Sequence, residues 1–237
     1  MIALHGQQVL VVGGSSGIGL ATAKLAVAAG AHVTIASRSE AKLELAVQQL
    51  GHGVVGRPVD AANDKSVADF FADGKAWDHV VATTGAGGRG RIADLSMADA
   101  LAAMNGKFWT YVRVARAAKI VSGGSLTLVS GLYGSKPAPG TAIVGAINGA
   151  IDGLTRGLAL DFAPTRVNTV SPGIIDTPLW DRMPAADRHA LFTKTAETLP
   201  ARRIGHAEDV GQAIIFLMTN PFTTGSVLHL EGGAMLV

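Results

Sequence analysis

The chain has 237 residues, 48% of them hydrophobic and 16% charged, with a formal net charge of +2. This length and composition suffice for the core of one domain and exclude a disordered chain. The 20 lysine and arginine residues are scattered, which disfavours nucleic-acid binding, and the absence of cysteine excludes disulfides and thiolate metal sites.

The seven histidines show no metal-ligand spacing, so we predict no metal site. No apolar stretch reaches bilayer length, and the first predicted strand begins too close to Met1 to leave room for a signal peptide. We therefore expect a cytoplasmic protein that binds neither membranes nor nucleic acid.

Four consecutive apolar residues at 9–12 predict a buried parallel strand, which a glycine-rich turn joins to an alanine-rich helix ending near residue 29. Later strands are expected at 31–36, 54–59, 79–84, 125–130, 166–170 and 226–230, and helices at 40–50, 64–73, 97–118 and 141–162. This alternation predicts a single α/β domain over residues 1–237, of the doubly wound Rossmann type, with a mostly parallel sheet of seven strands.

One segment, residues 178–203, is rich in Met, Phe, Trp and Leu and is interpreted as a mobile lid over a substrate pocket. Its residues Trp180, Met183 and Phe192 either line a hydrophobic pocket or belong to a subunit contact.

The turn after the first strand, Gly13-Gly14-Ser15-Ser16-Gly17-Ile18-Gly19, has the glycine pattern of a pyrophosphate-binding loop. Gly13 allows a sharp turn, Gly17 lets the backbone approach a pyrophosphate, and Gly19 lets the helix pack closely on the sheet. The free N–H groups at the start of the helix then face the anion. The alternative is an ordinary turn, which the flanking strand and helix disfavour.

The end of the second predicted strand bears on the choice of dinucleotide. An acidic residue there would hold the ribose hydroxyls of NAD, whereas this chain has Ser37 and Arg38, which suit a 2′-phosphate. We therefore predict NADP(H); the alternative for Arg38 is a solvated surface arginine. Asp60, at the end of the third strand, is placed either to accept from the adenine amino group or to cap a turn.

Together these motifs resemble the short-chain dehydrogenase/reductase family over almost the whole chain. The resemblance includes Asn105 in the predicted helix 97–118, the run Ser-Pro-Gly-Ile-Ile-Asp-Thr at 171–177, and the carboxy-terminal segments 203–210 and 224–233. Val12 departs from it, because the family often has Thr there. The resemblance implies that Ile175 and Thr177 contact the nicotinamide carboxamide.

The resemblance further implies an NADP(H) site. Its residues are Gly13, Ser15, Ser16, Gly17, Ile18, Gly19, Ser37, Arg38, Asp60, Ala61, Thr83, Gly85, Asn148, Pro172, Gly173, Ile175 and Thr177.

The resemblance ends where the family's chemistry resides. The family's reductases use a Ser and a Tyr-x-x-x-Lys, in which the tyrosine donates the proton, the lysine lowers its pKa and the serine steadies the substrate carbonyl. Aligned without gaps, Gly131 takes the place of the serine, Val144 that of the tyrosine and Asn148 that of the lysine. Losing a positioned acid lowers a rate about a hundred- to ten-thousand-fold, so an already activated acceptor would suffer least.

Three residues, Asn105, Ser130 and Tyr133, are candidates for the missing catalytic role. Ser130 precedes Gly131 and faces the opposite way on an extended strand unless the strand end turns. The Tyr133 phenol either reaches a bound carbonyl or packs under its loop. Asn105 is placed to hold a water or a backbone carbonyl, and water is the remaining donor. Asn148 can bond a ribose hydroxyl but carries no charge to lower a neighbour's pKa.

Other polar residues have simpler expected roles. Lys107 is expected on a solvated helix face, and Tyr111 in the core or an interface. Arg89 and Arg91 border the predicted pocket, where they could meet an anionic substrate. The resemblance implies a homodimer or homotetramer assembled through the helices 97–118 and 141–162, whose small residues allow a close approach.

Two functions follow from these observations. The first is an NADP(H)-dependent oxidoreductase with a non-standard proton donor, acting on a carbonyl or activated double bond of a small molecule. The second is a catalytically degenerate NADP(H)-binding protein, either a sensor or a non-redox pocket. The motif at 171–177 favours the first, because a sensor of the phosphate and adenine has less need of a nicotinamide contact.

Overall fold

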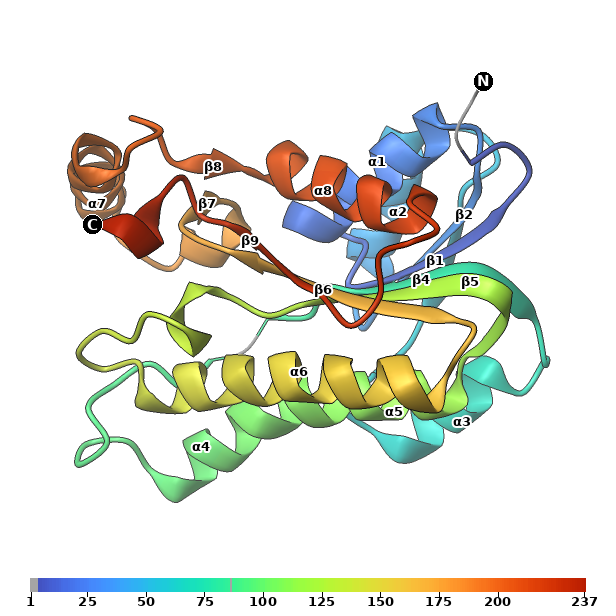
Figure 1. Ribbon diagram of the computed structural model, residues 1–237, viewed down its shortest axis with the longest axis horizontal. Coiled ribbons are helices and arrows are strands. Elements are labelled where there is room, and N and C mark those ends of the chain that lie inside the picture. The colour runs from blue at the N-terminus through green and yellow to red at the C-terminus, as the bar shows by residue number, and fades with distance from the viewer. Residues whose placement is uncertain (1–3, 86) are drawn as a thin grey trace.

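The computed structural model describes residues 4–85 and 87–237 and confirms the doubly wound α/β fold (Figure 1). Seven parallel strands form the central sheet in the order β3-β2-β1-β4-β5-β6-β9. These are β1 Gln8–Val12, β2 His32–Ser37, β3 Val55–Pro58, β4 Ala76–Ala82, β5 Lys119–Val129, β6 Arg166–Pro172 and β9 Val227–Leu230. The strand order reverses between β1 and β4, and ligands of such sheets bind at the carboxyl ends of the strands beside this switch.

Helices cover both faces of the sheet (Figure 1). One face carries α1 Gly17–Ala28, α2 Glu40–Leu50 and α8 Ala207–Thr219, and the other α3 Asp64–Phe71, α4 Met97–Met104, α5 Thr110–Ala117 and α6 Ala142–Asp161. Alternate residues of β1 enter the two cores: Val9 and Val11 pack on one side, Leu10 and Val12 on the other. Burial on both faces explains the uninterrupted apolar run in the sequence.

The long helix predicted at 97–118 is divided. A π-helical turn, Asn105–Trp109, separates α4 from α5. Thr110 Oγ1 donates to the Asn105 carbonyl oxygen over 3.0 Å, a bond that closes across this wider turn. The turn shifts the faces that the side chains present, which a regular helical period cannot predict.

Further elements differ from the sequence expectation. Strand β5 begins at Lys119, not at residue 125, and its pairing with β4 shifts register between Trp77 and His79. No helix was predicted for α8, although its buried Val210, Ile214 and Leu217 have helical spacing. Two-residue strands, β7 Ile175–Asp176 and β8 Gly205–His206, form a separate small sheet too short to leave a pattern.

The predicted lid, residues 178–203, starts just after β7 and ends just before β8, so this small sheet fixes both of its ends. It contains α7, Ala185–Thr198. Trp180 is buried, donates its indole N–H to the Ile175 carbonyl over 2.9 Å and packs edge-on against Phe192. The mobility of this segment stays a prediction.

Within the described residues, no helix combines the length and apolar character needed to cross a bilayer. Ala86, in the glycine-rich loop expected after β4, lies outside these residues.

Candidate functional site

The first turn of α1 faces the carboxyl end of β1. Its first backbone hydrogen bond runs from Leu20 N to Ser16 O, so the N–H groups of Gly17, Ile18 and Gly19 have no helical carbonyl to bond. Ser16 is the N-cap residue and makes no capping bond with its side chain. The turn therefore presents several backbone donors and the positive end of the helix dipole, as an anion site requires.

Gly19 holds α1 close to the sheet, as the sequence predicts. A β-carbon built on Gly19 would overlap the Gly13 carbonyl oxygen and lie 2.6 Å from Thr83 Oγ1. Thr83, just after β4, donates that hydroxyl to the carbonyls of Val12 and Gly13, at 3.2 and 3.3 Å. Gly13 itself has φ of 87°, which a residue with a side chain rarely adopts. The glycine pattern thus has a steric reason at this loop.

The end of β2 carries a polar group without a partner. Ser37 Oγ is buried, and no described residue forms a hydrogen bond with it. Arg38 beside it is exposed. The end of β2 therefore carries a buried hydroxyl with unmet hydrogen-bonding capacity next to an exposed guanidinium.

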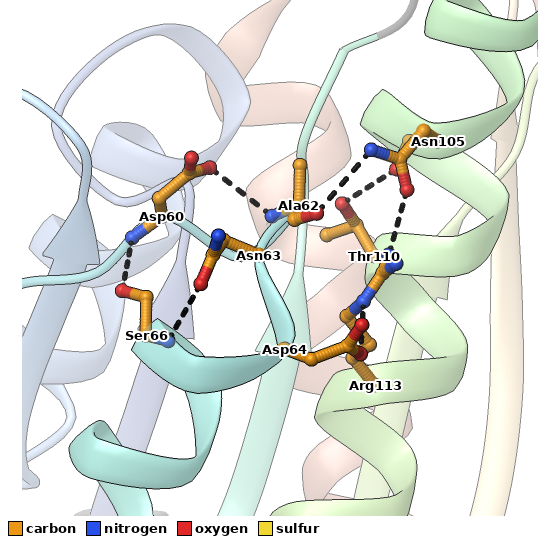
Figure 2. Close-up of polar contacts among 8 residues, drawn as sticks. All are labelled: Asp60, Ala62, Asn63, Asp64, Ser66, Asn105, Thr110 and Arg113. Atoms are coloured by element: carbon orange, nitrogen blue, oxygen red, sulfur yellow. Dashed lines mark hydrogen bonds and ion pairs between the residues drawn. The ribbon is translucent and has the colours of Figure 1, made fainter.

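Asp60 and Asn105 are both engaged in the structure of the loop after β3 (Figure 2). Asp60 Oδ1 accepts from Ala62 N over 3.1 Å, which is the turn-capping contact, and leaves the other carboxylate oxygen available to the predicted adenine contact. Asn105 Nδ2 donates to the Ala62 carbonyl over 3.2 Å, and its Oδ1 accepts from Arg113 Nη1 over 2.8 Å. Asn105 therefore holds a backbone carbonyl, one of the two roles predicted for it, and Ala61 is buried beneath this loop.

The chain after β6 returns to the glycine loop. A β-carbon on Gly17 would lie 3.4 Å from Thr177 Cβ, so two predicted cofactor contacts far apart in sequence are neighbours. Gly173 N donates to the Leu230 carbonyl over 3.0 Å, which ties the Pro172-Gly173 turn to β9, and Ile175 is buried below. Gly85, after β4, is exposed and has open space around its α-carbon.

Three loops at this edge meet around Arg89. Its guanidinium carbon lies 5.0 Å from the ring centroids of both Tyr133 and Trp180, a cation–π distance. Its Nη2 lies 3.5 Å from Tyr133 Oη, at the limit of a hydrogen bond. The ring of Tyr133 thus packs against the loop after β4, while its hydroxyl stays at the polar end of that contact.

Lys107 contradicts the sequence expectation. It is only 8% exposed, where a solvated face was expected, because the π turn directs it inward. Its ammonium donates to the Ser130 carbonyl over 2.6 Å and to Asn148 Oδ1 over 2.9 Å. Tyr111 is fully buried, and its hydroxyl lies 3.1 Å from the carbonyl oxygens of Thr84 and Val129, so it is a core residue.

The cluster around Lys107 contains further buried polar atoms. Burial lowers the pKa of Lys107 to about 8, and the charge of Asp152 opposes that shift. Burial also raises the pKa of the Asp152 carboxyl, against the opposing effects of the Ser130 hydroxyl and of His229, Arg156 and Lys107. Ser130 Oγ and Asp152 Oδ1 are both buried and make no hydrogen bond of good geometry among the described residues, although the Ser130 hydroxyl lies near enough to act on the carboxyl. Such unsatisfied groups are uncommon in a purely structural core.

Comparison with known proteins assigns the family. The family model described as Enoyl-(Acyl carrier protein) reductase matches residues 12–235. The short-chain dehydrogenase/reductase ATR9 of Stachybotrys chlorohalonatus is 34% identical over 258 aligned positions, which cover 100% of both chains. The chain belongs to the short-chain dehydrogenase/reductase family.

Many solved structures are similar to this short-chain dehydrogenase/reductase, including the following two. The MalC reductase/Diels-Alderase of Malbranchea aurantiaca has a TM-score of 0.91 at 28% identity, with 99% of this chain and 98% of MalC covered. A short-chain oxidoreductase of Pseudomonas aeruginosa PAO1, with NADPH bound and an atypical catalytic centre, has a TM-score of 0.90 at 26% identity, with 98% of each chain covered.

The sequence of this short-chain dehydrogenase/reductase did not lead us to predict that Lys107 and Asp152 belong to a buried polar cluster. The spacing of Asp152 four residues after Asn148 on α6 does place the two on one helix face. For Lys107 no comparable signal exists, because a regular helix would direct it elsewhere.

Proposed function

We propose that this chain is an NADP(H)-dependent oxidoreductase that reduces a carbonyl or activated double bond of a small molecule. The observation that carries the proposal is the juxtaposition of the free helix start at Gly17 with Thr177, since it joins a phosphate site to a predicted nicotinamide contact. The choice of NADP(H) over NAD(H) rests on Ser37 and Arg38. It is supported by the NADPH bound to the Pseudomonas relative and to a small-chain dehydrogenase 32% identical to this chain.

The predicted cofactor residues divide by the part of the dinucleotide they would hold. The N–H groups of residues 17–19 would bind the pyrophosphate, Ser37 and Arg38 the 2′-phosphate, and Asp60 the adenine. Thr177 and Ile175 would orient the nicotinamide carboxamide. When bound, the reduced cofactor supplies a hydride.

We further propose that Gly131, Val144 and Asn148 replace the Ser, Tyr and Lys of the family's catalytic set, and that Tyr133 is the proton donor. A β-carbon on Gly145 would lie 2.7 Å from the Tyr133 carbonyl oxygen, so Tyr133 is adjacent to the turn of α6 that carries Val144. Arg89 Nη2 points a donor at the phenol oxygen, which leaves the phenol hydrogen available to a substrate carbonyl.

Once Tyr133 has given its proton to the substrate oxygen, the adjacent guanidinium stabilises the phenolate that remains. Arg89 has no carboxylate partner within the described ion pairs, so its charge is available for this role. Asn105 contributes by holding the π turn 105–109 on the loop after β3, because both polar ends of its amide are already bonded. Ser130 would contribute through its unpartnered hydroxyl only if that group reaches the substrate.

The alternative proposal is a catalytically degenerate NADP(H)-binding protein. It is favoured by Gly131, Val144 and Asn148 together, none of which can donate a proton as tyrosine does.

Assembly through α4, α5 and α6 into a homodimer or homotetramer is part of the proposal. Its support is the exposure of Met97 and Leu101 on α4 and of Leu160 on α6, at 73%, 63% and 81%.

The test is NADPH oxidation with a panel of ketones, aldehydes and enones, for the natural chain and for Tyr133→Phe. We expect the variant to bind NADPH with unchanged affinity and to lose about a hundredfold or more in kcat/KM. Unchanged turnover would remove Tyr133 as the acid. Tight NADPH binding without oxidation by any acceptor would favour the degenerate alternative.

A further inference from the structure

The orientation of the Asn148 amide is fixed by Lys107. An ammonium group only donates hydrogen bonds, so the Asn148 atom that lies 2.9 Å from Lys107 Nζ is the oxygen Oδ1. The other end of the amide, Nδ2, therefore faces Gly131. Among the described residues, this amide makes one hydrogen bond, in which Oδ1 accepts from Lys107 Nζ.

Gly131 is the residue that makes room for this amide. A β-carbon built on Gly131 would lie 2.9 Å from Asn148 Nδ2 and 3.5 Å from its Cγ. A serine at 131 would therefore require the end of the Asn148 side chain to shift, and this shift would disturb its hydrogen bond with Lys107. Gly131 and Asn148 are thus sterically matched to each other.

Lys107 also accounts for the absence of a lysine at position 148. Its ammonium is buried and already lies against residue 148 and the Ser130 carbonyl. A lysine on α6 at this position would bring a second ammonium into the same buried site, where like charges are strongly unfavourable. The site therefore accommodates one ammonium group, which Lys107 supplies from the π turn between α4 and α5.

We propose that Lys107 is a positioning residue of the active site, which delivers from the π turn the positive charge that the α6 lysine of Tyr-x-x-x-Lys delivers in the family's reductases. It fixes Asn148 with Nδ2 toward Gly131, as a donor to an acceptor oxygen bound there. That oxygen is either a hydroxyl of the nicotinamide ribose or the carbonyl of the substrate. The identity of this oxygen rests on the proposed function. The pairing of Lys107 with Asn148 does not depend on it.

The first experiment exchanges the two residues. Asn148→Lys alone places two ammonium groups in one site, and we expect a melting temperature lower by roughly 5 °C or more and NADPH binding weaker by about tenfold or more. Asn148→Lys with Lys107→Met restores one cation, and we expect both properties to recover to near the natural values. The matched control pairs Asn148→Lys with Lys119→Met, an exposed lysine at the start of β5, and should not recover.

The second experiment removes the donor while keeping the fold. Asn148→Asp preserves the volume and gives Lys107 a better acceptor, so we expect an unchanged or higher melting temperature. If the acceptor oxygen belongs to the ribose, the Kd for NADPH rises about tenfold and kcat at saturation is kept. If it belongs to the substrate, the Kd stays constant and kcat falls by about tenfold or more.

Two results would overturn the inference. One is an Asn148→Lys variant as stable as its double variant with Lys107→Met, since the two side chains would then not share a site. The other is an Asn148→Asp variant with natural NADPH affinity and natural turnover. Because the exchange experiment is read by melting temperature and binding, it decides the pairing even if no substrate is found and the proposed oxidoreductase activity fails.

Discussion

The burial of Lys107 predicts an alkaline stability difference that can be measured without a substrate. Burial lowers its pKa from the ordinary 10.5 to about 8 in the folded chain. Below pH 8 the ammonium is protonated in both the folded and the unfolded chain, so its contribution to the unfolding free energy does not change with pH. Between pH 8 and 10.5 the unfolded chain binds the extra proton, so stability rises with pH over this window.

The magnitude of this rise follows from the same two values. Lowering the pKa from 10.5 to about 8 corresponds to about 3 kcal/mol of unfolding free energy. This free energy is fully present above pH 10.5 and is lost as the pH falls from 10.5 to 8. The charged groups that act on this ammonium are few: Asp152 faces it from α6, and Arg156 and His229 act on that carboxylate.

The assay is urea unfolding of the natural chain and of Lys107→Met at several pH values from 7 to 10.5. Because other groups titrate in both proteins, the quantity of interest is the difference between their unfolding free energies. We expect this difference to move by about 3 kcal/mol in favour of the natural chain as the pH rises from 8 to 10.5. Lys119→Met, at an exposed position, should show no such trend. A difference for Lys107→Met that stays flat over this range would refute the buried, hydrogen-bonded ammonium.

Three other predictions concern stability and the cofactor site. Burial lowers the pKa of His79 from 6.5 to about 4. The unfolding free energy of the natural chain should therefore fall by about 3 kcal/mol as the pH falls from 6.5 to 4. In the same unfolding assay, His79→Gln should lose much less over that range. Gly19→Ala should abolish NADPH binding or folding, because its β-carbon would overlap the Gly13 carbonyl oxygen. Gly157→Ala, whose β-carbon meets no atom within 4 Å, should leave the melting temperature and the Kd for NADPH near their natural values. Equal behaviour of the two variants would contradict the close packing of α1. Arg38→Asp should weaken NADPH binding by about tenfold or more with little effect on NADH, as measured by fluorescence titration, and an equal effect on both nucleotides would argue against a 2′-phosphate contact.

The fold could be predicted because its signals are local and repeated. Burial on both sheet faces makes β1 an uninterrupted apolar run, and Gly19 has the small size that the contact with Gly13 demands. The helix α2 was predicted at its observed bounds, 40–50. Among the elements that were missed, β7 and β8 have two residues each, too few to leave any periodicity. The helix α8 was also missed, although the spacing of its buried residues could have predicted it.

The candidate site could be predicted only where a residue acts through its position on a regular element. The glycine loop and Thr177 lie at strand ends, and the structure brings them together. Lys107 was misplaced because it lies within the π turn 105–109, where the helical period that the prediction assumed does not apply. The contact of Tyr133 with Arg89 joins two irregular loops, whose approach no local pattern records.

The central proposal is that this site reduces a substrate without the tyrosine and lysine that the family's reductases use. The most direct measurement is mass-spectrometric detection of deuterium in the product after a single turnover with NADPH deuterated at one face of nicotinamide C4. We predict that the deuterium of one face, and only that face, appears on the reduced carbon of an activated carbonyl or enone. Tight binding of the labelled cofactor with no deuterium in any acceptor of the panel would contradict the claim.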